Sequence, residues 1–177
     1  MRTRAYIICI CFFFSSQITY AQLNPWWLEQ TTIDSAELKR NVVADSVIHY
    51  AQTFIGVPYV WGGTDPHIGF DCSGFICYVY KKYGVELPRT SDLQFNAGKP
   101  IAYNEAQPGD LILFTGREAY GGEPGHVGIV LSYDEIKGFT FIHTSSETSG
   151  GVRISNELGE KYYYTRFLEI RRVIGIN

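Results

Sequence analysis

The hydrophobic pattern of this chain changes character near Asp110, and that change constrains the fold more than any other feature. Before it, apolar residues recur at helical spacing over 46–55 and again from Cys72 to a stop at Gly84. After it come short runs rich in β-branched and aromatic residues, which are typical of strands. The predicted strands cover 111–114, 127–131, 139–143, 151–155 and 167–174. Helices followed by a series of strands predict an α+β domain with an antiparallel sheet.

The N-terminal residues have the features of an export signal. Basic residues precede an apolar run over 5–14, and a polar stretch follows it. The run is about half the ~20 residues that a membrane-spanning helix needs, so we expect a signal peptide over 1–21. Export would place the protein in the periplasm or outside the cell, without stable membrane insertion.

We expect the rest of the chain to form an N-terminal arm over 22–45 and one domain over 46–177. The arm is too short to fold as a domain. Asp45 precedes the first helical run and is expected to be its N-cap. A short helix is expected near 91–97, and we expect the protein to be a monomer.

Charge excludes one class of partner. The formal net charge is −3, and the basic residues do not cluster apart from Arg171 and Arg172. An acidic chain without a basic patch is a poor ligand for nucleic acid or anionic membranes.

The cysteines point to a nucleophile. Cys9 and Cys11 would leave with the signal peptide, so Cys72 and Cys77 remain. Five residues apart on a helix they would point about 140° away from each other, so no disulfide is expected. Cys77 falls in the apolar pattern and is expected to pack in the core. Cys72 begins a helical run, where the positive end of the helix dipole favours a thiolate.

Two of the four histidines can supply a base. His126 stands at the mouth of one predicted strand, and His143 ends the next. If these strands pair, the imidazoles can lie side by side and form a relay in which His126 takes the thiol proton and His143 orients His126. His49 is expected to have a structural or surface role within a helix, and His67 to lie in a solvated loop.

Other chemistries are less well supported. Cysteine and histidine also bind zinc, but these residues lack the short paired spacing of zinc ligands. Ser73 has no Gly-x-Ser-x-Gly sequence around it, as a hydrolase serine would have. We therefore expect neither a metal nor a cofactor.

Five segments in order resemble the NlpC/p-sixty family of papain-like cell-wall cysteine peptidases over about residues 46–172. Each segment alone is weak, but five at workable spacing are specific. The segments are Gly56–Gly63, Phe70–Phe75, Leu87–Ser91, Pro108–Leu111 and Gly125–Ile129.

The resemblance implies a papain-like fold, with N-terminal helices packed on a central antiparallel sheet of about five or six strands. It implies a triad of Cys72 as nucleophile, His126 as base and His143. Tyr59 would lie beside the nucleophile and help to bind the oxyanion, although it could instead pack on Trp61, which is expected to line the substrate site.

Further substrate contacts follow from the same resemblance. Asp71 and Ser73 would receive the free amine of an N-terminal L-alanine, although Asp71 could also serve simply as the charge at a helix N-terminus. The glycine-rich segment 115–124 is hypothesised to form a wall of the cleft, with Arg117 available for a substrate carboxylate. An ordinary solvated loop is an equal alternative.

The implied activity is hydrolysis of peptidoglycan stem peptides or muropeptides between D-glutamate and the diamino acid, through a thioester. Residues 22–45 cannot form the SH3-like domain found in many family members, which leaves open whether free or sugar-linked peptides are preferred. The alternatives are a peptidoglycan amidase or acyltransferase on a related fold, and a non-catalytic wall-binding module.

Overall fold

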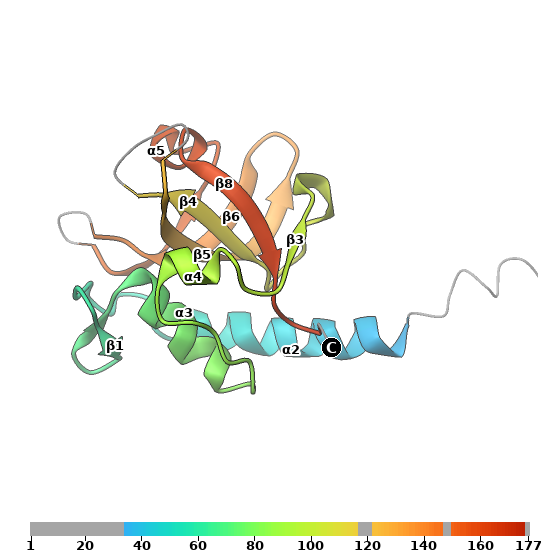
Figure 1. The fold of residues 1–177 in the computed structure, drawn as a ribbon, viewed down its shortest axis with the longest axis horizontal. Helices are drawn as coiled ribbons and strands as arrows, with labels where there is room; N and C mark the ends of the chain where they lie inside the picture. Colours follow the sequence, from blue (N-terminus) through green and yellow to red (C-terminus); the bar gives the residue numbers. More distant parts are fainter. Residues whose placement is uncertain (1–33, 117–121, 147–149, 176–177) are drawn as a thin grey trace, which may run out of the picture. The chain divides into compact units, whose positions relative to one another are not determined.

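A six-stranded antiparallel sheet forms the centre of the computed structural model of this protein (Figure 1). The structure describes residues 34–116, 122–146 and 150–175, so the expected signal peptide and Arg117 lie outside the described residues. The strand order is β3-β8-β4-β5-β6-β7. The strands are β3 (Lys99–Ile101), β4 (Leu111–Thr115), β5 (Pro124–Asp134), β6 (Gly138–Thr144), β7 (Val152–Asn156) and β8 (Phe167–Arg172).

The helices precede most of the strands, as predicted. They are α2 (Ser35–Gln52), α3 (Cys72–Lys81) and the single turns α4 (Ser91–Gln94), η2 (Tyr103–Glu105) and α5 (Lys161–Tyr164). Helices α2 and α3 lie together on one side of the sheet (Figure 1). A small hairpin of β1 (Thr64–Asp65) and β2 (Gly69–Phe70) leads into α3. Among the described residues, none of the helices has the length and apolar character needed to cross a membrane.

The sheet buries side chains on both faces, because successive residues of a strand point to opposite sides. One face packs Val127 and Ile129 against apolar residues of α2 and α3, including Val47 and Phe75. The other face buries an aromatic cluster that includes Phe114, Phe141 and Tyr163. The expected arrangement of helices packed on an antiparallel sheet is confirmed.

The boundary of the first helix was predicted wrongly. Helix α2 begins at Ser35, and its N-cap is Asp34, whose carboxylate accepts a hydrogen bond from the backbone N–H of Ala36. Asp45 is therefore an exposed residue inside the helix, and residues 35–45 are helical and continuous with the predicted helical run. The helical pattern is hidden in this part because the buried face carries a charge, Arg40.

A buried ion-pair network explains how Arg40 is accommodated. Its guanidinium lies 3.2 Å from the carboxylate of Asp110, which also contacts Arg172 at 2.8 Å. Asp110 is fully buried and immediately precedes β4. The network therefore ties α2 to the start of β4 and to β8, which are neighbouring strands of the sheet.

Candidate active site

The N-terminus of α3 carries Cys72 as its first residue. Asp71 is the N-cap, and its Oδ1 accepts a hydrogen bond of 2.6 Å from the backbone N–H of Gly74. Gly74 is required here because a Cβ atom would collide with the backbone carbonyl of Gly63. The loop before the hairpin and the start of α3 are thus in direct backbone contact. This close packing holds the cysteine at a fixed place on the helix.

Burial opposes ionisation of the Cys72 thiol, whereas the helix dipole considered in the sequence analysis favours it. Burial and then the negative charge of Asp71 raise the pKa of Cys72 to about 11, although backbone hydrogen bonds from Ser73 and Val127 oppose the shift. Sequence reasoning credited the helix N-terminus but could not weigh desolvation against it. A base is therefore needed to activate the sulfur.

His126 and His143 lie side by side, as the sequence predicted. Strands β5 and β6 are paired with Gly128 opposite His143, and His126 is two residues from Gly128 on the same face. Nε2 of His126 lies 2.9 Å from Nδ1 of His143. Nδ1 is therefore the remaining ring nitrogen of His126 through which it could accept a proton from sulfur.

Both imidazoles are neutral at neutral pH. Burial lowers the pKa of His126 to about 4. Burial, the neighbouring His126 and the charge of Arg153 hold the pKa of His143 well below its usual value. A neutral His126 keeps one unprotonated ring nitrogen, which is the form that a general base requires.

One cleft of about 950 Å³ brings together the predicted site residues that the structure describes, apart from His143. His143 is fully buried and lies behind His126. Trp61 is 88% exposed at this cleft. The residues that line it include Cys72, His126, Tyr59, Trp61, Asp71 and Ser73. His49 and His67 are exposed and do not line it, in agreement with the sequence interpretation.

Tyr59 is suited to donate a hydrogen bond in this cleft. Burial, and the nearby Cys72 and Asp71, raise the pKa of its hydroxyl, so the proton stays on oxygen. A parallel bridge to Phe70 fixes the backbone of Tyr59 next to the entry to α3. Tyr59 is therefore held beside the segment that leads into Cys72.

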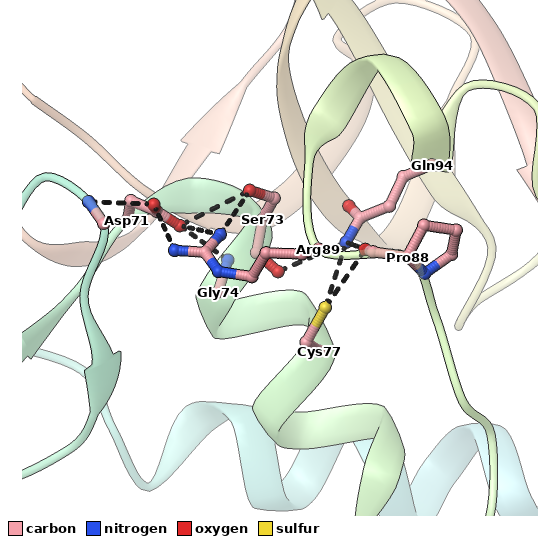
Figure 2. Close-up of polar contacts among 8 residues, drawn as sticks. Asp71, Ser73, Gly74, Cys77, Pro88, Arg89 and Gln94 are labelled. Atoms are coloured by element: carbon pink, nitrogen blue, oxygen red, sulfur yellow. Dashed lines mark hydrogen bonds and ion pairs between the residues drawn. The ribbon is translucent and has the colours of Figure 1, made fainter.

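Arg89 lines the cleft as well, although sequence reasoning gave it no role. Its guanidinium forms two hydrogen bonds with the carboxylate of Asp71, of 3.0 and 2.7 Å, and a third of 3.0 Å with Oγ of Ser73 (Figure 2). Asp71 also accepts from the backbone N–H of Gly62 at 3.0 Å. The Asp71 carboxylate is thus already compensated, and an incoming ammonium would have to share it with Arg89. Arg89 belongs to the segment Leu87–Ser91, which resembles the family, but no rule of residue spacing predicts its contact with Asp71.

The segment that carries Arg89 is held by the fully buried Gln94. Nε2 of Gln94 donates to the carbonyl oxygens of Pro88 at 2.8 Å and Ser73 at 3.2 Å (Figure 2). The thiol of Cys77 donates to the same Pro88 oxygen at 3.2 Å. Cys77 is therefore half-buried in a polar network, where the sequence had suggested a core position. Cys72 and Cys77 are both free, as predicted.

The arrangement as a whole defines a type of site: a cysteine at a helix N-terminus shares a cleft with a histidine that a second histidine holds in place. Such a site can attack an acyl carbon through sulfur, with the first imidazole moving the proton. Within the ranges that the structure describes, no group of three or more His, Cys, Asp or Glu side chains is arranged to hold a metal ion.

The chain belongs to the NlpC/P60 family, whose model matches residues 56–172. It is 44% identical over 86 residues to the bifunctional muramidase/DL-endopeptidase CwlT of Bacillus subtilis, which covers 48% of this chain and 26% of that protein. It is 37% identical over 127 residues to the gamma-DL-glutamyl hydrolase of Bacillus subtilis, covering 71% of this chain and 28% of that protein. The chain thus spans less than a third of the length of either relative.

Solved structures agree with the fold. A crystal structure of an NlpC/P60 family protein from Bacillus cereus is 33% identical and superimposes with a TM-score of 0.65, covering 74% of this chain and 40% of that one. The helices and six-stranded antiparallel sheet described above match it, which confirms the papain-like α+β fold that the resemblance implied.

Proposed function

We propose that this protein is a cysteine endopeptidase that hydrolyses peptidoglycan stem peptides at the bond between γ-D-glutamate and the diamino acid. The observation that carries the proposal is the placement of Cys72 and His126 in one cleft, with His126 held 2.9 Å from His143. Membership of the NlpC/P60 family and the names of the relatives support the substrate class. We also propose that the protein acts outside the cytoplasm and as a monomer.

The reaction would begin with transfer of the Cys72 proton to Nδ1 of His126 as sulfur attacks the γ-carbonyl carbon. The oxyanion would be held by the backbone N–H of Cys72 and the hydroxyl of Tyr59. The C–N bond then breaks, and His126 gives the proton to the leaving amine of the diamino acid. Water, deprotonated by His126, hydrolyses the thioester, and the proton returns to sulfur.

The direct test is incubation of the purified protein with muropeptides and mass spectrometry of the products. A fragment with a new N-terminal diamino acid supports the endopeptidase, whereas release of an intact stem peptide from the sugar supports an amidase. Cys72→Ala should abolish the product, and Cys77→Ala is the matched control because Cys77 lies outside the cleft lining. A product that survives in Cys72→Ala contradicts the mechanism.

Asp71 and Ser73 are proposed to receive the free amine of an N-terminal L-alanine, with Trp61 covering the peptide. Because Arg89 already pairs with Asp71, the amine would have to share that carboxylate. The prediction is tested with paired substrates, one with a free and one with an acetylated N-terminus. Faster cleavage of the free peptide, lost in Asp71→Asn, supports this subsite. Equal rates for the two peptides rule it out.

A further inference from the structure

The orienting residue His143 is itself a histidine, so the positions of the protons in the His126–His143 pair are ambiguous. Its ring nitrogens can each donate or accept, so the pair of His126 and His143 has two neutral proton arrangements. If Nδ1 of His143 accepts, His126 carries its proton on Nε2 and keeps Nδ1 free for the thiol proton. If Nδ1 of His143 donates, the proton of His126 sits on Nδ1, and His126 cannot act as a base toward sulfur.

Two hydroxyl groups lie at the far nitrogen of His143, where they can favour one of these arrangements. Nε2 of His143 lies 3.0 Å from Oγ of Ser155 and 3.3 Å from the hydroxyl oxygen of Tyr163. Ser155 lies on β7 and Tyr163 on α5, so two separate elements converge on one nitrogen. All three side chains are buried, with exposed fractions of 0% for His143, 3% for Ser155 and 2% for Tyr163. The two hydroxyls are therefore largely shielded from bulk water, although Tyr163 also lines the cleft.

We propose that Ser155 and Tyr163 are positioning residues that accept a hydrogen bond from Nε2–H of His143 and so keep its Nδ1 an acceptor toward His126. This role rests on the proposed function of Cys72 and His126. It applies most strongly after proton transfer, when His126 is an imidazolium whose Nε2–H must donate to Nδ1 of His143. His143 then has to carry its own proton on Nε2, and that buried N–H requires an acceptor.

The neutral character of the two hydroxyls suits this role. The S–H bond of Cys72 breaks, an N–H bond forms on Nδ1 of His126, and His143 changes no proton during the step. A carboxylate at the position of Ser155 would favour a charged His143, which would repel the imidazolium of His126. The ionisable groups that face His143 are His126 from β5, Arg153 from β7 and Tyr163 from α5. The positive charge of Arg153 adds to burial in keeping His143 neutral.

The test uses Ser155→Ala, Tyr163→Phe and the double variant, with Ser155→Thr as a rescue that keeps the hydroxyl. Exposed residues provide matched controls: Ser132→Ala on β5 and Tyr164→Phe on α5. Side-chain ¹⁵N NMR reports which nitrogen of His143 is protonated, independently of any substrate. The alkylation rate of Cys72 and the pH dependence of kcat and KM on stem peptides report the consequence.

We expect the Nε2–H form of His143 in the wild-type protein and a shift toward the Nδ1–H form in the double variant. The double variant should lose about 10- to 100-fold in kcat with little change in KM, as expected when a buried donor is left unpaired in the active state. Each single variant should lose less, because one hydroxyl remains. Ser155→Thr and both controls should keep the wild-type tautomer and rate.

Two results would overturn the inference. One is an Nδ1–H tautomer of His143 in the wild-type protein. The other is a double variant that loses activity only in proportion to its unfolded fraction, with the tautomer unchanged. If stem peptides are not cleaved at all, the proposed substrate fails, but the NMR and alkylation measurements still test the role of the two hydroxyls.

Discussion

Replacing Asp71 by Asn should lower the stability of the fold and at the same time make the nucleophile more acidic. The substitution keeps Oδ1, which caps α3 through the backbone N–H of Gly74. It replaces Oδ2 by an amide donor that faces two other donors, the guanidinium of Arg89 at 2.7 Å and the N–H of Gly62 at 3.0 Å. The cap is preserved, so the change isolates the charge and the second oxygen.

The expected loss of stability follows from these contacts. Two charge-assisted hydrogen bonds to Arg89 would nominally be worth about 3–6 kcal/mol. The Arg89 side chain is 41% exposed, so solvent screening reduces the effective contribution. We expect a net loss of about 2–3 kcal/mol in the free energy of unfolding, or about 5–10 °C in Tm for a domain of this size.

The thiol should respond in the opposite sense. The negative charge of Asp71 is the second cause, after burial, that raises the pKa of Cys72 to about 11. Removing it while Arg89 stays beside the helix N-terminus favours the thiolate, so the pKa should fall. General loosening of the site could also change both the stability and the pKa of the thiol. A control variant in the same cleft is therefore required.

The assay is the pH dependence of iodoacetamide alkylation in a Cys77→Ala background, with Tm measured on the same samples. Asp92→Asn is the control, because Asp92 lines the same cleft but is exposed. The midpoint of alkylation should move to lower pH in Asp71→Asn and stay in place in Asp92→Asn. An unchanged or higher midpoint in Asp71→Asn would refute the electrostatic reasoning, and an unchanged Tm would refute the stability reasoning.

Three further predictions concern other parts of the structure. Activity should fall as pH drops through about 4, where His126 becomes protonated, and a pH–activity titration checks this. The free energy of unfolding should already decline below about pH 6.5, because an unfolded histidine binds protons that the buried histidines do not. Denaturant titrations check this second expectation. Asp110→Asn should cost about 3–5 kcal/mol in urea unfolding, since it strands two guanidinium groups, whereas exposed Glu86→Gln should cost almost nothing. Gly74→Ala should cost about 1–3 kcal/mol through its clash with the Gly63 carbonyl, and Gly116→Ala, which has room for a Cβ, should not.

Elements with a regular hydrophobic pattern could be predicted from the sequence, and elements defined by long-range contacts could not. Strands β4 to β8 except for their ends, and the start of α3 at Cys72, follow from local pattern. The first half of α2 did not, because Arg40 occupies its buried face and is compensated by Asp110, far along the chain. Strand β3 was missed because three residues carry no periodicity and its formation depends on pairing with β8.

For the site, the sequence by itself determined which groups were available: a cysteine at a helix start, two histidines on neighbouring strands and a tyrosine before the helix. Residue type is a local property, and strands joined by a short turn usually pair, so the pairing of His126 with His143 could be anticipated. The tertiary structure decided the electrostatics. Burial raises the pKa of Cys72 despite the helix dipole, Arg89 compensates Asp71, and Ser155 and Tyr163 converge on His143. Desolvation and hydrogen bonds between distant segments arise only once the chain has folded, so they cannot be predicted from residue spacing.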